Sequence, residues 1–144
     1  MFIVDTESKT LSEKESKICH ALIMKNMFLC KRGRSDIELG INFLSGRAKP
    51  LTEQDRYKLY RIMNFLFTAI EDATTLEAGD TGTLTWYMDA AFAVHANDMK
   101  SQSGSIFTLG KGAIINSSSK QKRNTRSSAE VELNAVDNKI LAVI

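Results

Sequence analysis

The feature that most constrains the fold of this chain is the regular alternation of residues 84–95. Apolar side chains recur at every second position, which puts Trp86 on one side of an extended strand and Asp89 on the other. Two shorter stretches, 105–109 and 113–116, also have the composition of strands. The Gly-Lys-Gly sequence between them permits the positive backbone angles of a tight hairpin. We therefore predict three strands in this part of the chain.

Three helical patterns precede the strands. Residues 18–30 are apolar with few polar interruptions, which predicts a largely buried helix. The second pattern begins near Ser35 and ends before Gly46, and is expected to bury Ile37, Ile41 and Leu44. The third begins with Thr52 and Asp55, which have the spacing of an N-terminal cap. The apolar residues that follow are expected to share one face of that helix: Leu59, Ile62, Met63, Leu66, Phe67 and Ile70.

The composition is that of an ordinary globular protein, with 43% hydrophobic and 25% charged residues among 144. A formal net charge of +2 is too small to indicate a nucleic-acid partner by itself. The N-terminus lacks an apolar segment of the length that a signal peptide or membrane helix needs, so we expect an intracellular protein, cytoplasmic or nuclear, with no membrane partner.

The only two cysteines, Cys19 and Cys30, fall within the first helical pattern. A shared helix would hold them roughly 16 Å apart, whereas a disulfide needs Cα atoms within about 7 Å. They also lack the short paired spacing of zinc ligands. We therefore predict two buried free thiols.

A capping box marks the start of a C-terminal helix, with Ser127 as the cap and Glu130 in a structural role. At about 100° per residue, the apolar positions gather on one face: Leu133, Val136, Ile140, Val143 and Ile144. Glu132 lies at the edge of that face and is the carboxylate expected to face the sheet. Asp137 and Asn138 fall within the same helical pattern.

Several sequence blocks follow this order in the second half of the chain: 84–95, Lys100-Ser-Gln-Ser-Gly104, Ser119-Lys-Gln-Lys122 and Ser127-Ser-Ala-Glu-Val-Glu132. The order resembles the opening of the ribonuclease H domain in copia-type retrotransposon Pol polyproteins. The family pattern is approximately Asp-Ala-Ser, Lys-Ser-x-x-Gly, Lys-Gln and Ser-Ser-Thr-Glu-Ala-Glu. The chain departs from this pattern at Ala91, Ala129 and Val131.

The helical first half resembles the end of the reverse transcriptase in the same polyproteins. Where the family has Arg-Pro-Asp-Ile, this chain reads Arg34-Ser35-Asp36-Ile37. The polymerase's catalytic Tyr-x-Asp-Asp turn occurs nowhere in the sequence. Polymerase chemistry is therefore not expected of this chain.

The resemblance implies an α/β fold in which N-terminal helices precede a partial ribonuclease H-like fold of three strands and a helix. It also implies that Asp89 and Glu132 are catalytic, metal-binding carboxylates for Mg²⁺ or Mn²⁺. We expect their side chains to approach one another near the edge of the sheet. Ribonuclease H chemistry uses two divalent cations about 3.5 to 4 Å apart, held by more than two carboxylates.

The family's third aspartate lies in an Asp-Asn segment on a later strand, and Asp137-Asn138 are interpreted here as helical residues instead. The ligand set is therefore expected to be truncated, and the isolated chain to be inactive as a nuclease. His95, at the end of the first strand, is interpreted as a surface or hydrogen-bonded residue rather than a general base.

The loop region 100–126 is rich in basic residues and contains no acidic ones. Clustered charge is most often a solvated face. Its position beside the expected carboxylates favours contacts with the phosphates of an RNA:DNA hybrid or another nucleic acid. The predicted contact residues are Lys111, Lys120, Lys122, Arg123 and Arg126. The alternative function is a non-enzymatic nucleic-acid-binding module that uses this loop.

These patterns divide the chain into a polar N-terminal tail (1–16), a helical reverse-transcriptase region (17–78) and a truncated ribonuclease H-like domain (84–144). A turn-rich connector separates the last two. The predicted function is that of a fragment of a copia-type reverse transcriptase/ribonuclease H polyprotein. Its parent activities are RNA-directed DNA synthesis and hydrolysis of RNA in RNA:DNA hybrids, and its expected partners include the remaining parts of the polyprotein.

Overall fold

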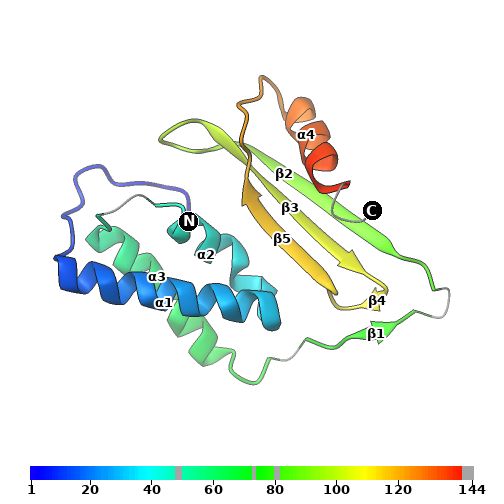
Figure 1. Cartoon of the computed structure of the whole chain (residues 1–144), viewed down its shortest axis with the longest axis horizontal. Coiled ribbons are helices and arrows are strands. Elements are labelled where there is room, and N and C mark those ends of the chain that lie inside the picture. The colour runs from blue at the N-terminus through cyan, green and yellow to red at the C-terminus, as the bar shows by residue number, and fades with distance from the viewer. Residues whose placement is uncertain (48–49, 73, 80–81, 141–144) are drawn as a thin grey trace. The chain divides into compact units, whose positions relative to one another are not determined.

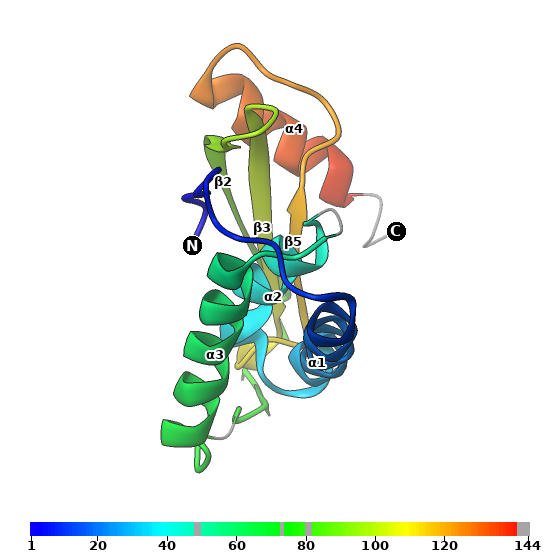
Figure 2. The ribbon, with the colours of Figure 1, turned by 90° about the vertical axis from the view of Figure 1, so that its left-hand side faces the viewer.

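The structure is a computed structural model that describes residues 1–47, 50–72, 74–79 and 82–140. The chain separates into two compact units, Met1–Ala73 and Thr74–Ile144, named here the helical unit and the sheet unit. Figures 1 and 2 show helices in the first and a sheet with one helix in the second. The predicted mixture of helix and sheet is therefore confirmed. Within the described residues, every helix is too short or too polar to cross a membrane.

The helical unit contains α1 (Glu13–Arg32), the short 3₁₀ helix η1 (Ser35–Ile37), α2 (Glu38–Ser45) and α3 (Glu53–Thr68). Capping boxes begin two of them: Ser12 with Glu15 at α1, and the predicted Thr52 with Asp55 at α3. The α1 helix thus starts inside the segment 1–16 that was predicted to be a tail. The rest of that segment is also ordered against the unit, since the Leu11 amide donates to the Leu51 carbonyl at 2.8 Å.

One apolar core holds the helical unit together. As predicted, Ile37, Ile41 and Leu44 are buried, and Leu59 of α3 joins them. The N-terminal segment adds Phe2, whose ring meets that of Phe43 edge to face with centroids 5.2 Å apart. Cys19 and Cys30 are buried free thiols, as predicted, and burial raises the pKa of the Cys30 thiol to about 11.

Two predictions about buried helix faces were wrong. The α1 helix buries one face only, and Phe28 is 66% exposed. On α3, Phe67 and Ile70 are exposed, since Leu66 is the last residue of the predicted face that packs against the core. Apolar periodicity identifies residues that are able to pack, but neighbouring elements cover just one side of each helix here.

The sheet unit is built on the antiparallel sheet β2-β3-β5, formed by Thr85–His95, Lys100–Thr108 and Ile115–Lys120. A separate two-stranded ladder pairs β1 (Glu77–Ala78) with β4 (Gly110–Lys111). The first predicted strand is confirmed, but β3 begins at Lys100 rather than at residue 105. The polar residues 100–104 extend the ladder because backbone hydrogen bonds do not depend on apolar side chains.

The predicted hairpin is confirmed, since β3 and β5 pair antiparallel from Phe107 opposite Ile115, but the connection is longer than residues 110–112 and contains a strand of its own. Gly110 and Lys111 form strand β4, and Gly112 has a φ of 76°, in the region that favours glycine. The partner of β4 is β1, which lies inside the segment 17–78 predicted to be helical. A Cβ on Gly110 would come within 2.3 Å of the Glu77 carbonyl oxygen, so glycine is needed for this close pairing.

The α4 helix (Ser128–Ile140) packs on one face of the sheet (Figures 1 and 2). Its buried side chains are Val131 and Ala135, one turn apart. The predicted apolar face was wrong: Leu133 is 71% exposed, and Val136 and Ile140 are exposed as well. Val143 and Ile144 lie outside the described residues.

A polar interface explains this orientation of α4. Lys139 Nζ donates to Ser117 Oγ at 2.6 Å and to Ser119 Oγ at 3.0 Å, both on the sheet. The helix therefore turns its small and polar residues inward to satisfy serines on the sheet. At its start, Ser127 Oγ accepts from the Glu130 amide as predicted, but Glu130 accepts from the Arg126 amide rather than from that of Ser127.

Candidate functional site

Asp89 lies in the middle of β2, directly opposite Gly104 of β3. Residues that pair directly across an antiparallel ladder project from the same face. Ala90 pairs with Ser103, which in turn pairs with Ser119, and Ser119 contacts Lys139 of α4. Asp89, one residue from Ala90, is therefore on the sheet face that α4 does not cover. Its carboxylate is exposed, and Oδ1 accepts from the neighbouring Ala90 amide at 2.9 Å.

Glu132 is exposed on α4. At about 100° per residue it lies roughly 80° from the centre of the side that Val131 and Ala135 bury. It therefore flanks the helix–sheet interface, while Asp89 belongs to the opposite face of the sheet. The structure does not bring the two carboxylates together on one face, and their approach at the sheet edge stays a prediction.

The described residues contain no group of three or more histidine, cysteine, aspartate or glutamate side chains that could hold a metal ion. A pair of hard divalent cations requires several clustered oxygen ligands. Asp89 and Glu132, on different sides of the sheet, do not provide such a cluster. The residues present therefore do not fit the two-cation site that the sequence resemblance implies, and no metal-dependent step follows from them.

His95 is buried at the end of β2 and is hydrogen-bonded, as expected. Its Nε2 lies 2.9 Å from Gln102 Oε1, and Gln102 Nε2 donates to Ser118 Oγ at 2.7 Å. An irregularity in the ladder between Ala91 and His95 precedes this contact. The histidine thus joins the three strands on the face that carries Asp89.

The predicted nucleic-acid contacts separate into paired and unpaired cations. Lys111 Nζ is 2.7 Å from Glu77 Oε2, and Lys120 Nζ is 2.8 Å from Asp98 Oδ2. The hydrogen bond from Lys120 holds the pKa of Asp98 below its usual range. Both acidic partners lie outside residues 100–126, the segment that contains no acidic residue. The expectation that the charges of these two lysines are not neutralised was therefore wrong. They are paired because chain folding brings in residues from β1 and from the β2–β3 turn.

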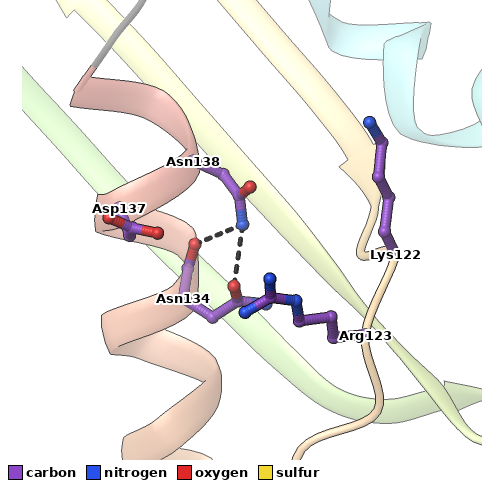
Figure 3. Close-up of a pocket in the computed structure, with 5 residues that line it drawn as sticks. All are labelled: Lys122, Arg123, Asn134, Asp137 and Asn138. Carbon is purple, nitrogen blue, oxygen red and sulfur yellow. Dashed lines mark hydrogen bonds between the residues drawn. The ribbon is translucent and has the colours of Figure 1, made fainter.

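Lys122, Arg123 and Arg126 are exposed, and no ion pair involves them within the described residues. Two of them line a hollow of about 150 Å³ beside α4 (Figure 3). Its lining residues are Lys122, Arg123, Asn134, Asp137 and Asn138. Sequence reasoning missed the contribution of α4, although these three helix residues recur with the spacing of one helical face.

Gln121 fixes the position of this hollow. Its backbone amide donates to the Ser101 carbonyl at 2.8 Å, and its side-chain Nε2 donates to Ser103 Oγ at 2.8 Å and to the Val131 carbonyl at 3.0 Å. Its Oε1 accepts from Asn134 Nδ2 at 2.8 Å. Because Gln121 is 4% exposed, β3, the end of β5 and α4 meet in one buried network. The two cations that follow it in sequence therefore leave the sheet at a defined point beside the helix.

Comparison with known proteins identifies relatives of this chain. It is 37% identical over 105 residues to the retrovirus-related Pol polyprotein from transposon RE1 of Arabidopsis thaliana. It is 34% identical over 105 residues to the corresponding polyprotein from transposon RE2 of the same plant. The chain belongs to the copia-type retrotransposon Pol family.

Each match covers 73% of this chain but 7% of the relative, so the chain spans a small part of the Pol polyproteins that it matches. The rest of a retrotransposon polyprotein is therefore its context. No family model and no solved structure matches the chain.

Proposed function

We propose that this chain is part of the reverse transcriptase/ribonuclease H region of a copia-type Pol polyprotein. The parent activities would be RNA-directed DNA synthesis and hydrolysis of RNA in RNA:DNA hybrids. The order of the elements carries this proposal. A helical unit precedes an antiparallel β2-β3-β5 sheet with Asp89 on its first strand, and α4 with Glu132 follows. The family's motifs thus fall on separate elements in the family's order.

Within that region, the proposed role of this chain is to hold a nucleic-acid backbone rather than to cut it. The exposed cations Lys122, Arg123 and Arg126, which form no ion pair with any residue that the structure describes, are available for phosphates. Such contacts position a duplex without reading its sequence. In the parent activity, Mg²⁺ or Mn²⁺ would activate the attacking water and stabilise the leaving oxygen. The carboxylates described here do not form the cluster that this chemistry needs.

Incubation with a labelled RNA strand annealed to DNA tests this role. With Mg²⁺ or Mn²⁺, we expect no RNA cleavage above background by the chain, and the same result for Asp89→Asn. Cleavage that Asp89→Asn abolishes, but that Asp72→Asn on the helical unit leaves intact, would show that the chain is an active nuclease. That outcome would also assign Asp89 to the nuclease.

A second candidate is a non-enzymatic nucleic-acid-binding module, favoured by the two unpaired cations at the hollow. The two functions can be distinguished with a fusion of this chain to the segment that follows the matched region in the RE1 relative. Cleavage of the hybrid by the fusion, dependent on Asp89, would support a parent nuclease. Salt-sensitive binding of the hybrid with no cleavage by the fusion would support the module.

A further inference from the structure

The hollow beside α4 offers positive charge and hydrogen-bond acceptors at the same place. Lys122 and Arg123 provide the charge from the chain after β5. Asn138 Nδ2 donates to both Asn134 O, at 2.6 Å, and Asn134 Oδ1, at 2.8 Å. Both of its amide hydrogens are thereby used, and what Asn138 offers to a ligand is its carbonyl oxygen. Asp137 adds a carboxylate, which accepts hydrogen bonds only when ionised.

Figure 3 shows how these groups are placed. Arg123 extends from the loop towards Asn134 and Asn138, while Lys122 stands apart on the other side of the hollow. Asp137, which precedes Asn138 on α4, lies on the side of Asn134 that is farther from Lys122. The buried Gln121 network holds the loop and the helix together at this point, so the backbone around the hollow is fixed by contacts within the protein. Such preorganisation reduces the entropy that binding would cost.

The mixture of charges restricts the class of ligand. A bare anion would be attracted by Lys122 and Arg123 but repelled by Asp137. A ligand that carries a phosphate together with a hydroxyl donor satisfies all three side chains. The volume of about 150 Å³ admits such a pair of groups with some water, but not a nucleobase as well. A phosphate with a neighbouring hydroxyl is the repeating chemistry of an RNA backbone, and DNA lacks the 2′-hydroxyl.

We propose that this hollow binds one ribose–phosphate unit of an RNA strand. Lys122 and Arg123 bind the phosphate, and Asp137 with the Asn138 carbonyl accepts a hydrogen bond from the 2′-hydroxyl. The inference rests on the proposed function, which makes RNA a partner of this chain. It adds that the hollow distinguishes an RNA strand from a DNA strand. Because both contacts are to the backbone, the site distinguishes the sugar without reading the base.

The test is fluorescence anisotropy with RNA and DNA single strands of one sequence, titrated at several salt concentrations. Replacing Lys122 and Arg123 together by Ala should reduce the slope of log affinity against log salt by up to about 1.4, or about 0.7 for each lost phosphate contact. The charge-matched control replaces Lys14 and Lys25, two exposed lysines of α1, together by Ala and should leave the salt slope unchanged.

Two substitutions of Asp137 separate the hydroxyl contact from a simple charge effect. Asp137→Ala removes the acceptor and should lower the preference for RNA over DNA by roughly three- to tenfold. Asp137→Asn keeps an acceptor oxygen and should retain part of that preference. If the carboxylate acts only through its charge, both variants will instead strengthen RNA and DNA binding equally, which would overturn the assignment of the hydroxyl.

The remaining outcomes separate this inference from the proposed function. Salt-dependent binding of RNA that survives unchanged in the Lys122/Arg123 double variant would overturn the site and leave the proposed function standing. Absence of binding to RNA and to the RNA:DNA hybrid would overturn both. Displacement of the RNA strand by a ribonucleoside monophosphate at equal nucleotide concentration would assign the hollow to free nucleotides instead of a strand.

Discussion

The two units of this chain are stabilised in different ways. The helical unit buries a continuous apolar cluster that includes Ile23, Ile41 and Leu59. In the described part of the sheet unit, Val131 and Ala135 are the only buried apolar side chains. The buried polar side chains there are His95, Ser101, Gln102, Ser103 and Gln121. One unit depends on apolar burial and the other on hydrogen bonds between side chains.

This difference has consequences for both stability and function. Apolar burial stabilises in proportion to area and tolerates small rearrangements. A buried polar network stabilises only while every member is satisfied, because an orphaned donor or acceptor costs about 1–3 kcal/mol. In exchange, such a network fixes the position of side chains around it. The hollow with Lys122 and Arg123 lies beside the Gln121 network.

The largest expected effect is that of Leu59→Ala, because Leu59 is fully buried in the apolar core. Removing its side chain leaves a cavity and should lower the free energy of unfolding by about 2–5 kcal/mol. Hydrogen exchange should show the loss in α1, α2 and α3, with protection in the β2-β3-β5 sheet retained. A loss below 1 kcal/mol in denaturant titration would contradict the apolar account of this unit.

A smaller effect is expected for Gln121→Ala in the sheet unit. The change leaves Ser103, the Val131 carbonyl and Asn134 without their Gln121 partner and should destabilise α4 and the sheet by about 1–3 kcal/mol. Amide exchange of α4 measures this directly. The control is Gln54→Ala, whose half-buried side chain accepts one hydrogen bond from the Asp5 amide. Equal effects of the two substitutions would mean that burial of the Gln121 network adds nothing.

The smallest effect is expected for Leu133→Gln, since this side chain is 71% exposed on the outer side of α4. The free energy of unfolding should change by no more than about 0.5 kcal/mol. A thermal or denaturant melt measures it. Destabilisation comparable to that of Gln121→Ala would show that the apolar face predicted from sequence, rather than the Val131 face, packs inward.

Local sequence signals predicted several features correctly. The Thr52–Asp55 cap, the alternation of β2 and the two free cysteines were all confirmed, because each depends on neighbours in sequence or on residue type alone. The inward face of α4 was not predictable in the same way. The apolar stripe exists, but Ser117 and Ser119 of the sheet bind Lys139 on the opposite side of the helix. That opposite side therefore faces the sheet.

The candidate site shows the same limit. Sequence identified Lys120 as an unneutralised cation, but Asp98 comes within 2.8 Å of it only after the β2–β3 turn forms. The position of Asp89 was predicted from the alternation of a strand, and that of Glu132 from the period of a helix. Neither pattern specifies on which face of the sheet α4 will lie. The helix residues that line the hollow were overlooked because polar positions on a helix are ordinarily solvated.

The sequence by itself therefore determined the types of element, their order and the family to which the chain belongs. Each of these depends on short-range patterns, such as caps, alternation and linked motifs, that one stretch of chain carries alone. Only the tertiary structure decided which cations remain unpaired and which side of α4 faces the sheet. These outcomes depend on buried polar groups finding partners from distant segments, since a buried donor or acceptor left without a partner costs about 1–3 kcal/mol.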